Sequence, residues 1–221
     1  MPLTNSRPII CYVTDRKAFA VSEGIAGTLE RIQMAASAGI DWIQVREKDL
    51  STRELLGLAC DAVASARRDA AARVIVNDRF DVSLAAGAAG VHLGRESVPV
   101  DEVVRWHRGR NAPEGFLVGA SCHDVEQARE AASSGADYIF FGPVFETPSK
   151  RACGGPQGLE RLRRVCREVP VPAIAIGGVN ARNAADCIRA GAAGIAAIRL
   201  FQEATDPQAL AEIMAEIHGI A

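Results

Sequence analysis

The sequence predicts an α/β fold in which eight parallel strands alternate with helices to form a closed (β/α)8 TIM barrel. We expect residues 1–221 to form one such domain. Eight short apolar runs alternate with helical segments, which is typical of parallel strands joined by right-handed crossovers. No linker or shift in composition marks a domain boundary. Four segments also resemble one another, and they lie at 35–47, 84–96, 131–143 and 188–200.

The four repeated segments share one internal order, as "AASAGIDWIQVRE" at 35–47 illustrates. A helix ends in small residues, a glycine follows, and an apolar strand begins after a short polar or small pair. Gly39, Gly87 and Gly135 recur at equal intervals, and Gly191 follows after a slightly longer one. Each interval accommodates two strand–helix units. An open doubly wound sheet is the alternative, but it would favour neither eight strands nor a repeat through the whole chain.

The other four strands are expected between the repeats, as runs rich in β-branched or apolar residues. They read "IICYVT" (9–14), "RVIVN" (73–77), "FLVGA" (116–120) and "PAIAI" (172–176). Ser51, Asp124 and Asn180 are candidate helix N-caps, because their side chains can accept a hydrogen bond from the first turn. The helices are expected at 22–38, 51–70, 79–87, 99–109, 124–134, 157–168, 180–191 and 205–218.

Composition narrows the class of protein. Hydrophobic residues make up 48% and charged residues 24%, which suits a globular domain with a sizeable core. A net charge of −2 gives no electrostatic basis for binding nucleic acid or an anionic membrane. The N-terminus has no apolar signal region, so we expect a cytoplasmic protein. Six scattered cysteines without a C-x-x-C pair indicate reduced, mostly buried thiols.

The stretch "IQVREKDL" (43–50) is apolar at first and then becomes polar and basic. Alternation places Ile43 and Val45 on one face, and Gln44, Arg46 and Lys48 on the other. Barrel active sites lie at the C-terminal ends of the strands. We therefore expect the polar face of this strand to point inward at the mouth of an active site.

Charged side chains gather at the other predicted strand ends. Cations in such a cluster suit phosphate and diphosphate, and a carboxylate among them suits a Mg²⁺ that takes further ligands from the substrate. The cations are Arg46, Lys48, Arg95, Lys150 and Arg199, and the carboxylates are Asp15, Asp78 and Glu96.

Two glycines, Gly177 and Gly178, follow the seventh strand, and a helix begins just beyond them. Backbone N–H groups and the positive end of a helix can hold a phosphate there, although a simple tight turn is the alternative. The long loop at 142–158, with glycines and a proline, is able to close over a bound substrate.

Other candidates keep two interpretations. His92 lies in an apolar run, which favours a hydrogen-bonded histidine facing inward over a ligand. His123 stands where a loop turns into a helix, so capping or surface placement competes with acid–base work. Cys122 is expected to be a packed thiol, because no third group that would orient a Cys–His pair is evident.

The sequence resembles the thiamine-phosphate synthase and TenI superfamily nearly from end to end. The matching motifs include "YVTDR" (12–16), "QVREKDL" (44–50), "VNDRFDVSLAAGAAGVHLGRES" (76–97), "GASCH" (119–123), "GADYIFFGPVFETPSK" (135–150) and "AIAIGGVNARN" (173–183). The synthases of this superfamily join hydroxymethylpyrimidine diphosphate to a thiazole phosphate and release pyrophosphate. The resemblance therefore implies a transferase of thiamine biosynthesis with small phosphorylated substrates, and it gives no oligomeric state.

The resemblance also implies roles for individual residues. The expected catalytic residues are Arg46, Lys48, Ser121, His123 and Lys150. The expected substrate-binding residues are Gln44, Asn77, Thr147, Gly177, Gly178 and Arg199. Asp78 is the expected ligand of Mg²⁺.

Three regions depart from the synthase pattern. Synthases usually have a glutamine where this chain has Arg95 and a second Mg²⁺ carboxylate where it has Ser97, for which Glu96 is a candidate substitute. They usually have a serine where this chain has Arg199. Their lid usually reads T-x-T-K, where this chain has Thr147 and Lys150 around a Pro-Ser pair.

These departures leave two alternatives. The TenI branch shifts a thiazole tautomer without metal, and a histidine at the position of His123 serves as its acid–base. A barrel that binds a phosphate ligand without catalysis is the other alternative. The synthase interpretation is preferred because the side chains that would bind diphosphate are otherwise present.

Overall fold

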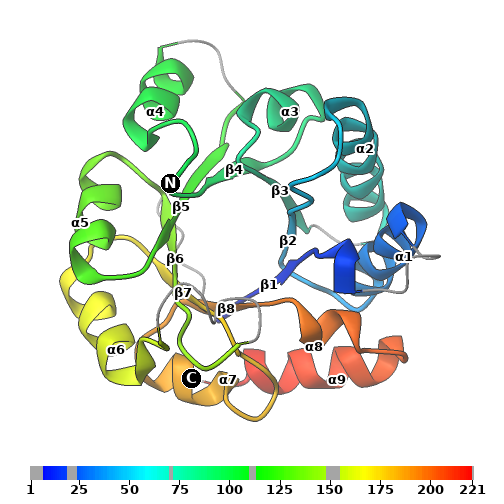
Figure 1. The fold of residues 1–221 in the computed structure, drawn as a ribbon. Coiled ribbons are helices and arrows are strands. Elements are labelled where there is room, and N and C mark those ends of the chain that lie inside the picture. The colour runs from blue at the N-terminus through cyan, green and yellow to red at the C-terminus, as the bar shows by residue number, and fades with distance from the viewer. Residues whose placement is uncertain (1–6, 19–23, 70–71, 110–112, 148–154, 221) are drawn as a thin grey trace.

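A computed structural model describes residues 7–18, 24–69, 72–109, 113–147 and 155–220. Eight parallel strands close into a barrel in chain order, and β1 pairs with both β2 and β8. The predicted (β/α)8 barrel is therefore confirmed (Figure 1). The strands are β1 (Ile9–Val13), β2 (Trp42–Val45), β3 (Arg73–Asn77), β4 (Gly90–Leu93), β5 (Leu117–Cys122), β6 (Tyr138–Phe141), β7 (Ala173–Ile176) and β8 (Gly194–Ala197).

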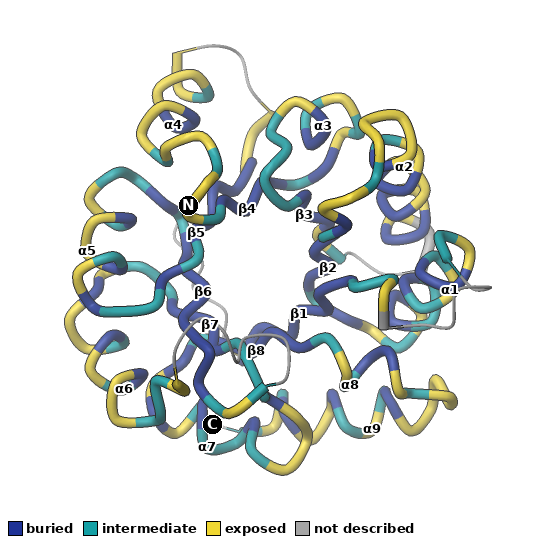
Figure 2. The backbone as a smooth tube through the Cα atoms, in the orientation of Figure 1, coloured by how far each residue is buried: buried dark blue, intermediate teal, exposed yellow. Residues whose placement is uncertain are grey.

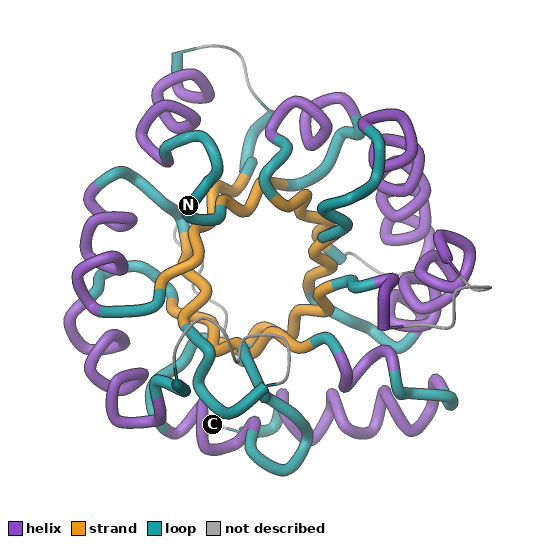
Figure 3. The backbone as a smooth tube through the Cα atoms, in the orientation of Figure 1, coloured by secondary structure: helices purple, strands orange, loops and turns teal. Residues whose placement is uncertain are grey.

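The helices form an outer ring around the strands (Figure 3). No helix in the described part of the chain is long and apolar enough to cross a membrane. The ring consists of the 3-10 turn η1 (Arg16–Ala18) and the helices α1 (Gly24–Ser37), α2 (Thr52–Asp69), α3 (Phe80–Ala85), α4 (Val100–Arg108), α5 (Val125–Ser133), α6 (Gly158–Glu168), α7 (Ala184–Arg189), α8 (Arg199–Gln202) and α9 (Pro207–His218).

Two of the three expected caps are confirmed. Ser51 Oγ accepts from the backbone N–H of Glu54 at 3.3 Å, and Glu54 reaches back to the Ser51 N–H at 3.0 Å. Asp124 accepts from the N–H of Gln127 at 2.7 Å. Asn180 does not begin a helix, because its side chain accepts from the N–H of Arg182 in a turn that precedes α7.

The repeated glycines end the helices that lead into β2, β4, β6 and β8. Their φ angles are +88° at Gly39, +64° at Gly87, +93° at Gly135 and +101° at Gly191. This left-handed backbone conformation lets the chain turn from a helix into the next strand. Residues with a Cβ rarely adopt it, so glycine occupies these positions. The sequence repeat is thus a repeat of helix C-terminal turns.

Strand alternation produces two apolar layers. Ile9, Cys11 and Val13 of β1 face the barrel interior, where they join Trp42 and Tyr138. The alternate residues of β1 belong to the layer between the barrel and its helices. Burial is accordingly concentrated on the strands and on the inner helix faces (Figure 2).

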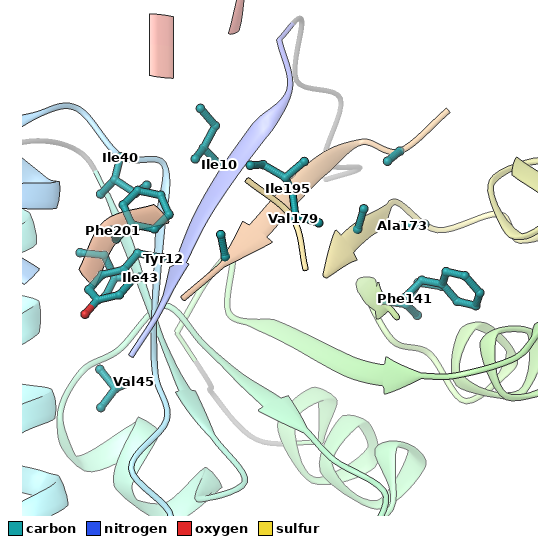
Figure 4. Packing of buried hydrophobic residues seen from close by; sticks show 14 of the residues in the cluster. Ile10, Tyr12, Ile40, Ile43, Val45, Phe141, Ala173, Val179, Ile195 and Phe201 are labelled. Atoms are coloured by element: carbon teal, nitrogen blue, oxygen red, sulfur yellow. The ribbon is translucent and has the colours of Figure 1, made fainter. Parts of the chain in front are cut away.

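The short helix α8 was not expected from the sequence. Its Phe201 is fully buried, and the Phe201 ring centroid lies 5.1 Å from that of Tyr12 on the outer side of β1 (Figure 4). Four residues are too few for a helical hydrophobic pattern, and the sequence predicts the next helix only at 205–218. The contact with Tyr12 stabilises α8.

Candidate active site

The mouth of the barrel at the C-terminal strand ends is organised around Asp78. Asp78 follows β3 with a φ angle of +62°. No other non-glycine residue in the described part of the chain has a positive φ. Its Oδ1 accepts hydrogen bonds from Ser97 Oγ and, at 3.2 Å, from the Gly94 N–H. Its Oδ2 lies 2.6 Å from Asn77 Nδ2 and 3.2 Å from Lys48 Nζ. An aspartate whose backbone is held in the left-handed conformation by this many contacts is typical of a functional site.

These contacts keep Asp78 ionised. Burial by itself would raise the pKa of the carboxyl group. The hydrogen bonds from Ser97 and Gly94, together with the nearby Lys48 ammonium, outweigh it and lower the pKa below its ordinary value. The site therefore presents a carboxylate beside a cation at neutral pH.

The polar end of β2 points into the mouth as expected. Gln44 is buried, and its Nε2 donates to Asn77 Oδ1 at 3.2 Å. Arg46 is half-buried and Lys48 is exposed, two and four residues further on. Gln44, Asn77, Asp78 and Lys48 thus form one continuous polar contact chain across β2 and β3.

Sequence analysis missed Glu47, which lies between the two basic residues and is buried. Its carboxylate oxygens each lie 3.1 Å from the backbone nitrogen of Arg16. Burial raises the pKa of Glu47 above its ordinary value. Thr14 Oγ1 accepts from the Arg46 N–H at 2.9 Å in the same region, so the loops after β1 and β2 are joined. Strand alternation places Glu47 on the same outward face as Val45. That position could have indicated that Glu47 is buried.

Three polar side chains continue inward from the mouth. Ser121 Oγ lies 2.9 Å from His92 Nε2, and His92 Nδ1 lies 3.2 Å from Tyr138 Oη. His92 is 1% exposed and is fully hydrogen-bonded, which confirms the interpretation of an inward-facing histidine. Cys122 is buried and burial raises its pKa to about 12, as befits a packed thiol.

His123 is half-buried at the start of α5, and its ring is held by the neighbouring loop. Its backbone N–H donates to Gln127 Oε1 at 2.9 Å, and its Nδ1 contacts the carbonyl oxygen of Gly142. Because a carbonyl oxygen only accepts, Nδ1 carries a proton and Nε2 is left as the base of the neutral ring. Helix-end placement and acid–base capacity are thus both present in His123.

Gly177 and Gly178 form a tight cradle after β7, with φ angles of +94° and +66°. A Cβ on Gly177 would lie 2.5 Å from Pro143 Cα, and one on Gly178 would lie 2.5 Å from the Glu146 carbonyl oxygen. Asn183 Nδ2 donates to the Gly178 carbonyl oxygen at 3.0 Å. Within the described chain, neither glycine N–H donates to a protein acceptor. Two close backbone donors are what a phosphate subsite requires.

The remaining candidate residues have no contact with the Asp78 cluster among the interactions described above. Thr147 is half-buried in the loop after β6, whereas Lys150 lies outside the described residues. Arg199 opens α8 as an exposed side chain. Glu96, considered as a second metal carboxylate, is exposed too. Across the described ranges, no three His, Cys, Asp or Glu side chains are grouped to hold a metal.

Comparisons with known proteins place this site in a family. The family model described as thiamine monophosphate synthase matches residues 10–201. A thiamine-phosphate synthase of Roseiflexus castenholzii is 37% identical over 217 residues, which cover 98% of this chain and 91% of that protein. A thiamine-phosphate synthase of Methanoculleus marisnigri is 47% identical over 166 residues, covering 75% of this chain and 76% of that protein.

A solved structure agrees with these relatives. Thiamine phosphate pyrophosphorylase from Pyrococcus furiosus superposes with a TM-score of 0.80 at 32% sequence identity, covering 95% of this chain and 94% of the other. The chain therefore belongs to the thiamine monophosphate synthase family.

Proposed function

We propose that this protein is a transferase that joins hydroxymethylpyrimidine diphosphate to thiazole phosphate, with release of pyrophosphate, in thiamine biosynthesis. The observation that carries the proposal is the Lys48–Asp78 pair, 3.2 Å apart at the mouth and flanked by Asn77. A departing diphosphate needs its negative charge neutralised, and this end of the barrel supplies both a cation and a carboxylate for a metal. The named relatives support the same activity.

Electrostatic stabilisation is the main task in this reaction, because the diphosphate leaves before the thiazole nitrogen attacks the pyrimidine methylene carbon. Arg46 and Lys48 would take up charge on the diphosphate oxygens. Gln44 and Asn77, already in contact with each other, would fix the pyrimidine end and one diphosphate oxygen. Ser121 would donate a further hydrogen bond from the opposite side of the mouth.

Mg²⁺ fits the donor set around Asp78. The carboxylate is ionised, and the Ser97 hydroxyl is a second oxygen beside it. Mg²⁺ commonly binds one or two carboxylates and completes its shell with waters and substrate phosphate. When bound, the ion would neutralise diphosphate charge, with Asp78 as its protein ligand.

The thiazole phosphate would occupy the cradle after β7. The N–H groups of Gly177 and Gly178 supply backbone donors, and Arg199 and Thr147 lie in the flanking segments. Backbone donors discriminate little between phosphate esters, so this subsite would serve either branch of the family.

A second candidate function is thiazole tautomerisation. The observation that favours it is the His123 ring, whose Nδ1 contact with Gly142 leaves Nε2 as a base. Ser97 in place of a carboxylate is consistent with a reaction that needs no metal.

One experiment separates the two functions. Coupling and tautomer conversion are assayed on the wild type with Mg²⁺ and with EDTA. The synthase proposal requires coupling that depends on Mg²⁺ and is abolished by EDTA. Tautomer conversion that persists in EDTA and fails in His123→Gln, without coupling, would overturn it in favour of the alternative.

A further inference from the structure

A buried line of hydrogen bonds runs from the barrel interior to its mouth. Tyr138 of β6, His92 of β4 and Ser121 of β5 are linked in that order, at 3.2 Å and 2.9 Å. Tyr138 is 0% exposed and His92 is 1% exposed, whereas Ser121 is half-buried at the mouth. Tyr138 and His92 are both buried, and among the described contacts Ser121 joins them to the mouth.

The surroundings of Tyr138 determine the acceptor to which its hydroxyl group donates a hydrogen bond. Its ring packs in the apolar interior, with centroid distances of 4.7 Å to Trp42 and 5.5 Å to Phe140. Burial holds the pKa of its hydroxyl well above the ordinary value, so the group stays protonated. Among the described residues, His92 Nδ1 is the acceptor placed for this proton. A buried O–H group donates wherever an acceptor is available, because an unpaired one is costly.

The remaining protons follow from the chemistry of imidazole. A neutral ring carries one N–H, so when Nδ1 accepts from Tyr138, Nε2 must donate. Nε2 then donates to Ser121 Oγ, which leaves the proton of Ser121 free to point into the mouth. In the opposite order, Ser121 would donate to His92 and present only lone pairs to an anion.

We propose that Tyr138 and His92 are positioning residues that hold Ser121 as a hydrogen-bond donor toward the departing diphosphate. This inference rests on the proposed coupling reaction. The negative charge on the diphosphate oxygens grows as the diphosphate leaves, so a donor already oriented toward it acts mainly in the transition state.

Gly119 of β5 provides the room for this arrangement. A Cβ at Gly119 would lie 2.0 Å from Tyr138 Cζ and 2.4 Å from its hydroxyl oxygen. The ring of Tyr138 therefore lies over the neighbouring strand β5 where that strand has no side chain, and its hydroxyl reaches His92 of β4. The glycine of "GASCH" serves this buried contact.

The test removes one hydroxyl group. Tyr138→Phe keeps the ring and deletes the donor to His92. Tyr12→Phe is the matched control, because Tyr12 is equally buried but lies on the outer side of the barrel wall, outside the Tyr138–His92–Ser121 line. Nitrogen-15 NMR of the histidine rings reports the tautomer, with His92 assigned by the signals lost in His92→Gln.

The inference requires that His92 carries its proton on Nε2 in the wild type and in Tyr12→Phe, and shifts toward the Nδ1 form in Tyr138→Phe. It also requires that kcat for coupling falls about tenfold or more in Tyr138→Phe, the scale of one hydrogen bond to a charged group. KM for the thiazole phosphate should not change. The double variant Tyr138→Phe/Ser121→Ala should lose no more kcat than Ser121→Ala alone.

Two results would overturn the inference. One is an Nδ1 proton on His92 in the wild type. The other is a loss of kcat in Tyr138→Phe that adds fully to that of Ser121→Ala. A wild type without coupling activity would refute the proposed function instead, and the NMR measurement would still decide the proton order.

Discussion

Lys48 Nζ lies 3.2 Å from Asp78 Oδ2, which joins the basic loop after β2 to the acidic turn after β3. The Lys48 side chain is 57% exposed and Asp78 is 28% exposed, so the pair adds little to stability. Its consequence is chemical. A negative ligand that approaches Lys48 competes with Asp78, and a cation that approaches Asp78 competes with Lys48. In the proposed reaction, Mg²⁺ and diphosphate arriving together would satisfy both residues at once.

Replacing Asp78 with Asn tests this relationship. We expect kcat/KM for coupling to fall by about a hundredfold, because charge neutralisation by a metal contributes several kcal/mol to the transition state. Steady-state rates at several Mg²⁺ concentrations measure the effect. The exposed carboxylate of Glu96 serves as a control, and Glu96→Gln should leave the Mg²⁺ dependence near that of the wild type. Equal losses in both variants would contradict the role of Asp78.

Ser97→Asp makes the opposite change. Ser97 Oγ contacts Asp78 Oδ1, so an aspartate there would place two carboxylates side by side. Without metal they repel each other, and with Mg²⁺ they share it. We expect the Mg²⁺ concentration for half-maximal coupling to fall by about tenfold, a change of roughly 1.4 kcal/mol in binding. Thermal stability without metal should fall slightly. A Mg²⁺ requirement equal to that of the wild type would show that position 97 lies outside the metal site.

The fold was predictable because the repeat records its geometry. Gly39, Gly87 and Gly135 mark equivalent helix ends with left-handed φ angles, so their spacing reflects pairs of strand–helix units. Local sequence signals were less informative at positions where tertiary contacts determine the secondary structure. Asn180 has the chemistry of a cap, but it forms a turn before the helix. Phe201 belongs to a helix because it packs on Tyr12, a contact that arises only when the barrel closes.

The residue types in the site were predictable, but not their connections. Strand alternation placed Gln44 at the mouth, and the structure joins it to Asn77. The link from Ser121 through His92 to Tyr138 depends on the lateral register of three strands, which sequence periodicity does not specify. Glu47 was missed for a related reason. A charged residue in a polar loop reads as solvated until the structure shows the backbone group that it contacts.

Glu47 should make stability depend on pH. Burial raises its pKa in the folded state, so between the unfolded value of about 4.3 and the folded value the native protein binds more protons. Stability contributed by this group is therefore lost as pH rises through that window. Glu47→Gln keeps an acceptor for the Arg16 N–H and cannot ionise. We expect its stability relative to wild type to improve from pH 4 to pH 7 in urea unfolding.

Two further variants complete the Glu47 measurement. Glu47→Ala leaves the Arg16 N–H without its acceptor and should cost about 1–3 kcal/mol at any pH in that range. Glu203→Gln changes an exposed glutamate and should follow the pH profile of the wild type. A Glu47→Gln profile parallel to that of the wild type would contradict an effect of burial on the pKa.

Gly177→Ala tests the phosphate cradle, and Gly39→Ala is its control. The φ angles are nearly equal, at +94° and +88°, so both variants incur a similar backbone penalty of about 1 kcal/mol. A Cβ at Gly39 meets nothing within 4 Å, whereas one at Gly177 would lie 2.5 Å from Pro143 Cα. Relieving that clash must move the loop after β7 away from the loop after β6, and the two N–H donors move with it.

We therefore expect Gly177→Ala to lose about 1–3 kcal/mol more stability than Gly39→Ala. Its KM for thiazole phosphate should rise at least tenfold, while the KM for the pyrimidine diphosphate stays within about twofold, because Lys48 and Asp78 lie on the other side of the mouth. Gly39→Ala should change neither constant. A sulfate- or phosphate-soaked crystal should place the anion on the N–H groups of Gly177 and Gly178. An unchanged KM in a folded Gly177→Ala protein, or an anion bound only on the outer helices, would place the thiazole phosphate elsewhere.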